Sequence, residues 1–332
     1  MDAYQLITDL RQSSDLHAKS AKYVSSLLPK RLYHNKELAE FLEQTLRLAA
    51  CGLTAVEMQF GTDAAHAKLI SGKMDHKVIA TYHNGTHTRL MMLRDALAYA
   101  RMRRIYDGDD FFPDRDLILL VFAASIHDAI QGNGRGVDER KSAELAVKIL
   151  RDHPIYTDED ISKVQNAILA TAFDPLTKQQ SVTLDRPHPH MQEALAIGDL
   201  LSLCRPDGPV FSIAHVPESL QTKQGGYDQI FVTEAAKDGF AFAGKNLQDC
   251  LRYLGTKETL RKAFGKCLGE QVGFYRNHSY QDPRVDEWFP SRTANANFIQ
   301  YRLCPAYEAG ALTPLQTYEL AIERAKILFA TK

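Results

Sequence analysis

The sequence predicts an all-α protein whose main part is a helical bundle. With 332 residues, of which 45% are apolar and 24% charged, the chain can bury a large hydrophobic core. Long stretches repeat their apolar residues at helical spacing, and later stretches are apolar on nearly every face. A helix that is apolar all round belongs in the centre of a bundle. Strand-like patterns are confined to short pieces, so we expect at most a small irregular or β-containing insertion.

Residues 1–79 are expected to form an N-terminal helical region. Amphipathic patterns predict helices from about Asp2, from the SSD segment at 13–15, from Asn35 to a stop at Gly52, and over 54–70. No chemistry is evident in this region. Its scattered histidines are interpreted as surface or packing residues, and they are His17, His34, His66 and His76.

The next region holds strongly apolar helices that carry isolated polar residues. The stretch Leu117–Ile126 is apolar all round and ends in the dipeptide His127-Asp128. Later, Glu193–Cys204 is apolar on nearly every face except at Asp199. An unpaired carboxylate would be costly in such surroundings, so something must compensate the charge of Asp199.

We place a core domain at residues 80–280. Within it, residues 205–245 are turn-rich (RPDGP, QTKQGGYDQ), with short β-like pieces such as QIFVT, and predict a loop-rich excursion. Helices resume over about 246–277 and 313–330. Residues 281–332 are predicted to form an irregular segment and a helix that pack on the core.

The charge balance favours a small-molecule substrate. Lys and Arg (40) nearly equal Asp and Glu (41), so the chain lacks the basic field that binds a nucleic-acid polymer or an anionic membrane. No apolar run is long enough to span a bilayer, and the N-terminus lacks the apolar stretch of a signal peptide, so we expect a cytoplasmic protein. The cysteines show no CxxC spacing, which leaves His and carboxylates as metal ligands; they are Cys51, Cys204, Cys250, Cys267 and Cys304.

Several of the isolated polar residues together suggest a metal site. In the YHNGTH element, His83 and His87 are four residues apart and would face the same way on a helix. Together with His127-Asp128 and Asp199, His87 completes a set of two imidazoles and two carboxylates, which suits Mg²⁺, Mn²⁺, Zn²⁺ or Fe²⁺. The alternative is a pair of partly buried histidines and a chance HD dipeptide.

The order of these residues, H…HD…D, resembles that of the HD superfamily of metal-dependent phosphohydrolases. The YHNGTH element resembles class I cyclic-nucleotide phosphodiesterases in particular, as does its spacing to the HD dipeptide. The fragment Ile168–Thr171 is similar to the LAT helix of that family, and Gln271–Phe274 (QVGF) to its QxGF element. The similarity covers about residues 80–275.

The resemblance implies a role for each of these side chains. His83 would be the general acid that protonates the leaving alkoxide, while His87, His127, Asp128 and Asp199 would hold the tighter metal ion. Water activated by the ion would be the nucleophile. Asp128 would also act in catalysis if it bridges to a second ion and orients the hydroxide.

The chain departs from the phosphodiesterase pattern near the second ion. Gln131 stands where HDxxH has its last histidine, and Thr171-Ala172 stands where Thr-Asp is expected. Both changes indicate one tight ion, with any second ion bound more weakly. Asp199 also follows the HD dipeptide sooner than in those enzymes, which suggests a smaller bundle.

The substrate-binding candidates are Gln271, Phe274, Gln131 and His190. By the resemblance, Gln271 would hydrogen-bond a base and Phe274 would stack on it. His190, beside His188 in RPHPH, could ligate a second ion or contact phosphate, the alternative being a solvated loop.

Two further elements have a structural and a functional interpretation. Asn133 and Arg135, on the Gly-rich turn GNGRG, could contact phosphate or simply form a turn. The segment Asp138–Ala143 resembles the NExxSA element of small bacterial HD phosphohydrolases. Its acidic residues, Asp138 and Glu139, could lie near the site or could cap a helix.

The sequence therefore predicts a metal-dependent phosphohydrolase that cleaves a phosphoester of a nucleotide or cyclic nucleotide. The alternatives are a non-catalytic nucleotide-binding regulatory protein and an HD-type di-iron oxygenase. Any phosphoester satisfies the ligand set, and residue types do not define the oligomeric state.

Overall fold

The computed structural model describes residues 15–63, 68–71, 77–133, 136–174, 179–182, 188–221, 229–242 and 244–330. The helix predicted from Asp2 falls outside these residues, as do Arg135, His66 and His76. Contacts divide the chain into two units. The first unit comprises Met1–Gln59, Gly85–Leu200 and Tyr280–Asp282, and the second comprises Phe60–Asn84, Leu201–Ser279 and Pro283–Lys332. The sequence-based division at 79 and 280 stays a prediction about domains.

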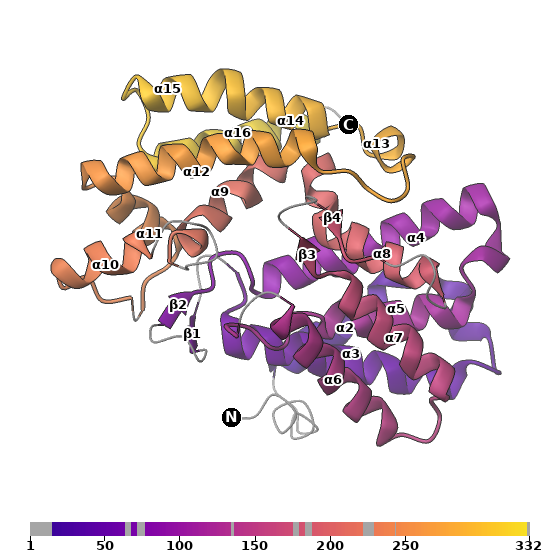
Figure 1. The fold of residues 1–332 in the computed structure, drawn as a ribbon. Helices are drawn as coiled ribbons and strands as arrows, with labels where there is room; N and C mark the ends of the chain where they lie inside the picture. The colour runs from indigo at the N-terminus through magenta and orange to yellow at the C-terminus, as the bar shows by residue number, and fades with distance from the viewer. Residues whose placement is uncertain are drawn as a thin grey trace. The chain divides into compact units, whose positions relative to one another are not determined.

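The described part of the chain is mainly helical, so the predicted all-α class is confirmed (Figure 1). The first unit contains α2 (Asp15–Leu27), η1 (Lys30–His34), α3 (Ala39–Phe60, whose last residue belongs to the second unit), the π-helix η3 (His87–Leu93), α4 (Arg94–Asp107), η4 (Asp109–Phe111), α5 (Asp114–Ile126), α6 (Val137–Arg151), α7 (Asp158–Ala170), β3 (Phe173–Asp174), β4 (Gln179–Gln180) and α8 (Pro189–Leu200). The second unit contains β1 (Leu69–Ser71), β2 (Lys77–Ile79), η5 (Leu201–Cys204), α9 (Gly208–Ser219), α10 (Ile230–Lys237), α11 (Leu247–Leu254), α12 (Glu258–Asn277), α13 (Val285–Trp288), α14 (Arg292–Phe298), the π-helix η6 (Ile299–Leu303), α15 (Cys304–Glu308) and α16 (Pro314–Ala330).

The strands described are short and form two antiparallel hairpins. In one, Leu69 of β1 pairs with Ile79 of β2. In the other, Phe173 of β3 pairs with Gln180 of β4.

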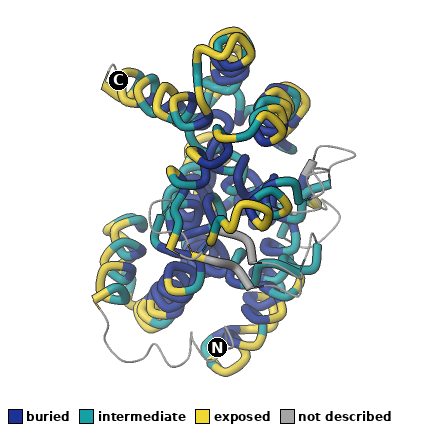
Figure 2. Tube along the Cα trace, turned by 90° about the vertical axis from the view of Figure 1, so that its left-hand side faces the viewer, coloured by how far each residue is buried: buried dark blue, intermediate teal, exposed yellow. Residues whose placement is uncertain are grey.

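Helix α5 lies at the centre of the first unit. It packs against α4, α6, α7, α8 and η3, and every residue from Asp116 to Ile126 is buried. This agrees with the apolar pattern of its sequence, because a helix surrounded by others has no solvent-facing side. Around it, α7 packs against both α6 and α8, and α8 packs against α4. Buried residues line the inner sides of the helices, and exposed residues cover the outer sides (Figure 2).

The predicted helix stop at Gly52 is wrong, because α3 continues through it to Phe60. A Cβ built on Gly52 would lie 2.9 Å from the Ser125 Oγ of α5. The glycine therefore allows close approach of two helices. It does not end one.

The second unit packs around α9 and α12. Helix α12 contacts α9, α14 and η6, while α16 contacts α9 and α11. The helix predicted over 313–330 is confirmed as α16. None of the described helices has the length and apolar composition needed to cross a membrane.

The loop-rich excursion predicted at 205–245 contains two helices, α9 and α10. Pro209 lies in the first turn of α9, where a missing N–H costs nothing, so the DGP sequence starts a helix. The prediction that QIFVT is β-like is wrong, because this segment begins α10. Phe231 and Ala235 are fully buried at a spacing of four, which is a helical spacing.

Candidate metal centre

Three elements of the first unit bring the predicted metal ligands together. His87 is the first residue of η3, His127 and Asp128 directly follow α5, and Asp199 lies near the end of α8. The π-helix η3 packs against both α5 and α8. A π-helix changes the direction of side chains relative to an α-helix, and such segments often occur at functional sites.

The ligand atoms converge around His87 Nε2. This atom lies 3.2 Å from His127 Nε2, 3.0 Å from Asp128 Oδ2 and 3.2 Å from Asp199 Oδ1. His127 Nε2 also lies 2.9 Å from Asp128 Oδ2. Both histidines are 1% exposed, so the imidazoles meet in a buried space.

This geometry fits a divalent ion. Donor atoms about 2.1 Å from an ion and at right angles to each other lie about 3 Å apart. The separations of 2.9–3.2 Å match that value. His87, His127 and Asp128 offer ligand atoms that all lie within 4.8 Å of one another, and Asp199 joins them through its contact with His87.

The orientation of the His127 imidazole ring also suits a role as a metal ligand. Its Nδ1 lies 2.9 Å from the carbonyl oxygen of Ala124, which can only accept a hydrogen bond. The proton therefore sits on Nδ1, and the lone pair of Nε2 points toward His87 and Asp128. A histidine fixed through its second nitrogen is the usual arrangement in metal sites.

The carboxylates make the centre attractive to a cation. Burial alone lowers the pKa of His87, but the hydrogen bonds and charges of Asp128 and Asp199 raise it to about 9. A proton and a metal ion compete for the same nitrogen, so carboxylates that favour the protonated imidazole also favour the ion.

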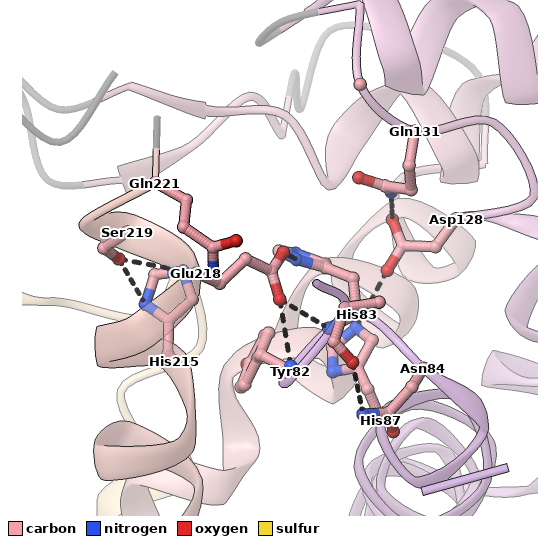
Figure 3. A network of polar contacts seen from close by, with 12 residues as sticks. Tyr82, His83, Asn84, His87, Asp128, Gln131, His215, Glu218, Ser219 and Gln221 are labelled. Carbon is pink, nitrogen blue, oxygen red and sulfur yellow. Dashed lines mark hydrogen bonds and ion pairs between the residues drawn. The ribbon is translucent and has the colours of Figure 1, made fainter. Parts of the chain in front are cut away.

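A glutamine binds the outer oxygen of each aspartate. Gln131 Nε2 donates to Asp128 Oδ1 at 2.8 Å, and Gln180 Nε2 donates to Asp199 Oδ2 at 3.1 Å (Figure 3 shows the Gln131 contact). Gln131 therefore contacts a predicted ligand, where the sequence suggested a substrate contact.

The two acidic residues of the Asp138–Ala143 segment differ in their surroundings. Asp138 accepts hydrogen bonds from the backbone of Gly132 and Asn133, so it caps the turn after the HD dipeptide. The Oε2 atom of Glu139, in contrast, is buried without a hydrogen-bond partner. Burial, with the charges of Asp128 and Asp138, raises the pKa of Glu139.

In the second unit, His83 is bound to a buried carboxylate. Its Nδ1 lies 2.5 Å from Glu218 Oε1, and the backbone N–H of Tyr82 donates to Glu218 Oε2 at 2.9 Å (Figure 3). Burial would raise the pKa of Glu218, but the charge and hydrogen bond of His83, with the charge of His215, hold it below its ordinary value. Glu218 is therefore ionised and accepts a hydrogen bond from the proton-bearing Nδ1 of His83.

The structure places His190 away from the metal ligands. Its Nε2 lies 2.7 Å from Asp116 Oδ2, and Asp116 also binds Lys163 at 2.9 Å. Asp116 is in the first turn of α5, and eleven residues of helix at 1.5 Å each put it about 16 Å from His127. His190 thus belongs to an ion-pair network at the opposite end of that helix.

The two base-binding candidates lie on α12 in the second unit. Gln271 and Phe274 are both half-buried, and the Phe274 ring stacks against His278 with centroids 5.7 Å apart. Their role in substrate binding stays a prediction.

The sequence patterns did not predict that Glu218 and Gln180 would contact the candidate site residues. Glu218 lies in an apolar stretch, FSIAHVPES, so the signal that singled out Asp199 was also present there. Gln180 lies in the polar run KQQS and carries no such signal.

Comparisons of the chain with models of known protein families, with curated proteins and with solved structures found no match.

Proposed function

We propose that this chain is a metal-dependent phosphohydrolase that cleaves a phosphoester bond of a nucleotide or cyclic nucleotide. The observation that carries the proposal is the convergence of His87, His127 and Asp128, whose ligand atoms lie 2.9–3.2 Å apart, with Asp199 Oδ1 3.2 Å from His87 Nε2. They come from residues in the order H…HD…D, so the sequence pattern and the geometry support the same ligand set.

The ligand types favour hydrolysis. A divalent ion held by this set would polarise phosphoryl oxygens and lower the pKa of a water molecule, which is what phosphoester hydrolysis needs. The chain supplies imidazole nitrogens and hard carboxylate oxygens, a mixture suited to Mg²⁺, Mn²⁺, Zn²⁺ or Fe²⁺. His127 contributes its lone pair because Ala124 fixes its proton on the other nitrogen.

His83 is the proposed general acid. It precedes His87 by four residues in the sequence. The carboxylate of Glu218 holds Nδ1 and fixes the imidazole orientation, as a catalytic histidine requires. The proposal that the substrate is a nucleotide rests on the resemblance of YHNGTH and QVGF to phosphodiesterase elements.

Metal analysis of the purified chain, combined with a substrate panel, tests the proposal. The panel contains cyclic nucleotides, nucleoside monophosphates and bis-para-nitrophenyl phosphate, each with Mg²⁺, Mn²⁺, Zn²⁺ or Fe²⁺. We expect bound metal and turnover of at least one substrate, both lost in His87→Asn and Asp128→Asn. His34→Asn is the matched control, because His34 is exposed and outside the centre.

Other outcomes would replace the proposal with an alternative. Tight nucleotide binding without turnover in the presence of Mn²⁺ would indicate a regulatory protein. Oxygen uptake by an iron-loaded chain that hydrolyses no phosphoester would indicate an oxygenase. Metal content and activity that survive Asp128→Asn would exclude the ligand set itself.

A further inference from the structure

The two aspartates of the metal centre share one arrangement. Asp128 turns Oδ2 toward His87 Nε2 at 3.0 Å, and its Oδ1 accepts a hydrogen bond from Gln131 at 2.8 Å. Asp199 turns Oδ1 toward the same nitrogen at 3.2 Å, and its Oδ2 accepts from Gln180 at 3.1 Å. Each carboxylate therefore has an inner oxygen at the centre and an outer oxygen on an amide.

The direction of both amide contacts follows from chemistry. An ionised carboxylate can only accept hydrogen bonds, so each glutamine must present its NH₂ group and turn its carbonyl oxygen away. The hydrogen of each N–H bond has a partial positive charge and points toward the carboxylate. An ion cannot bind the outer oxygen along the direction that this N–H occupies.

Gln180 is held firmly enough to position Asp199. It is 5% exposed, and its backbone pairs with Phe173 in the β3–β4 hairpin. Its backbone carbonyl oxygen also accepts a hydrogen bond from the side chain of Gln281 at 3.4 Å, in the segment Tyr280–Asp282. The neighbouring Tyr280 hydroxyl donates to the carbonyl oxygen of Leu200, the residue after Asp199, at 2.8 Å.

The charge of the centre matches one ion. The carboxylates of Asp128 and Asp199 together carry the charge that neutralises one divalent cation. Among the described residues, His87, His127 and Asp128 form the one group of His, Cys, Asp or Glu side chains with converging ligand atoms. A second ion that used an outer oxygen would have to approach it beside the amide N–H that already contacts it.

We propose that Gln131 and Gln180 are positioning residues that hold Asp128 and Asp199 as one-oxygen ligands, so that the centre binds one divalent ion per chain. This inference rests on the proposed function for the presence of the metal. Beyond the proposed function, it predicts how many ions bind and which residues set the affinity for them.

Titration of the full chain with Mn²⁺, after removal of metal by a chelator, tests the inference. Calorimetry gives the number of ions and the Kd, and electron paramagnetic resonance distinguishes an isolated Mn²⁺ from a coupled pair. We expect one ion per chain with an uncoupled spectrum. Gln131→Ala and Gln180→Ala should each raise the Kd for Mn²⁺ by about 10- to 100-fold.

The matched control is Gln165→Ala, which changes a half-buried glutamine on α7 of the same unit. Its Kd for Mn²⁺ should equal that of the wild type. Urea unfolding of the metal-free variants separates positioning from general damage, since a positioning residue changes the Kd more than the stability.

Two ions per chain with a coupled spectrum, or an unchanged Kd in both glutamine variants, would overturn the inference. A chain that binds one Mn²⁺ with the expected variant effects but hydrolyses nothing would contradict the proposed function alone. A chain that binds no Mn²⁺ would contradict both.

Discussion

Gly198 lies against Ala96 so closely that a Cβ built on residue 198 would stand 2.6 Å from the Ala96 Cβ. The contact joins α8 to α4 one residue before Asp199, and α4 continues directly from the π-helix that begins at His87. The separation of these two helices therefore controls the separation of two proposed ligands. No side chain larger than hydrogen fits at residue 198 without moving them.

Gly198→Ala should destabilise the protein by about 1–3 kcal/mol, the usual cost of overpacking. It should also weaken Mn²⁺ binding, because α8 must move away from α4 and carry Asp199 with it. Urea unfolding and calorimetric titration measure the two effects.

The control for this prediction is Gly269→Ala on α12, an exposed position where a new Cβ meets nothing within 4 Å. That change should leave the Kd for Mn²⁺ unaltered and raise stability by about 0.5–1 kcal/mol, because alanine favours helix over glycine. Equal metal affinity in Gly198→Ala and wild type would show that the close contact does not position Asp199.

The raised pKa of His87 predicts how the stability of the metal-free protein depends on pH. Asp128 and Asp199 overcome the effect of burial and raise this pKa from 6.5 to about 9, so the folded state holds a proton that the unfolded state releases earlier. The resulting stabilisation is complete below pH 6.5 and is lost as the pH rises through 9. Over that interval, unfolding in the presence of a chelator should become easier by roughly 3 kcal/mol.

The variant His87→Asn lacks the titrating group, so its stability should be much flatter between these pH values. His34→Asn, at an exposed site, should keep the wild-type profile. Parallel profiles for wild type and His87→Asn would refute the attribution to this histidine.

The parts of the metal centre that could be predicted are those with a local signal. An apolar helix that ends in His127-Asp128 and an apolar helix that contains Asp199 are visible as isolated polar residues in hydrophobic sequence, and the structure has both helices. Burial of a charge needs compensation wherever it occurs, so such residues stand out before any fold is known.

The hydrogen-bond partners could not be predicted, because packing sets them. Glu218 is separated from His83 by 135 residues, and no periodicity connects the two. Gln180 reaches Asp199 only because the β3–β4 hairpin places it there. The mistaken strand at QIFVT has a similar cause, since burial of Phe231 and Ala235 on one helical face overrides the β preference of a short segment.

Glu218→Gln should lower the rate of the proposed phosphoester hydrolysis without changing metal affinity. The amide retains the shape of the carboxylate but cannot support a protonated imidazole, so His83 loses the partner that fixes its proton. We expect kcat to fall by about 10²-fold or more, with the Kd for Mn²⁺ unchanged and the pH profile altered.

A double-mutant cycle with His83→Ala checks whether Glu218 acts through this histidine. In the His83→Ala background, Glu218→Gln should have little further effect, because residues that act as one unit are not additive. Full additivity of the two losses would show that Glu218 serves another role.

Glu139→Gln should make the protein more stable at pH 8 and leave its stability nearly unchanged at pH 4. Burial of Glu139, with the nearby charges of Asp128 and Asp138, raises its pKa, and its Oε2 is buried without a hydrogen-bond partner. A raised carboxyl pKa means that the neutral form suits the fold. The stabilisation that comes from the neutral carboxyl group of Glu139 is therefore fully present below the ordinary pKa. It is lost as the pH rises through the raised pKa.

The glutamine never ionises, so it avoids that loss, and the gain at pH 8 should be about 1 kcal/mol. Thermal unfolding at both pH values, with chelator present, measures it. The control is Glu144→Gln, which changes an exposed residue on the same helix, α6. If Glu139→Gln and Glu144→Gln shifted the melting temperature equally at pH 8, Glu139 would be an ordinary solvated carboxylate.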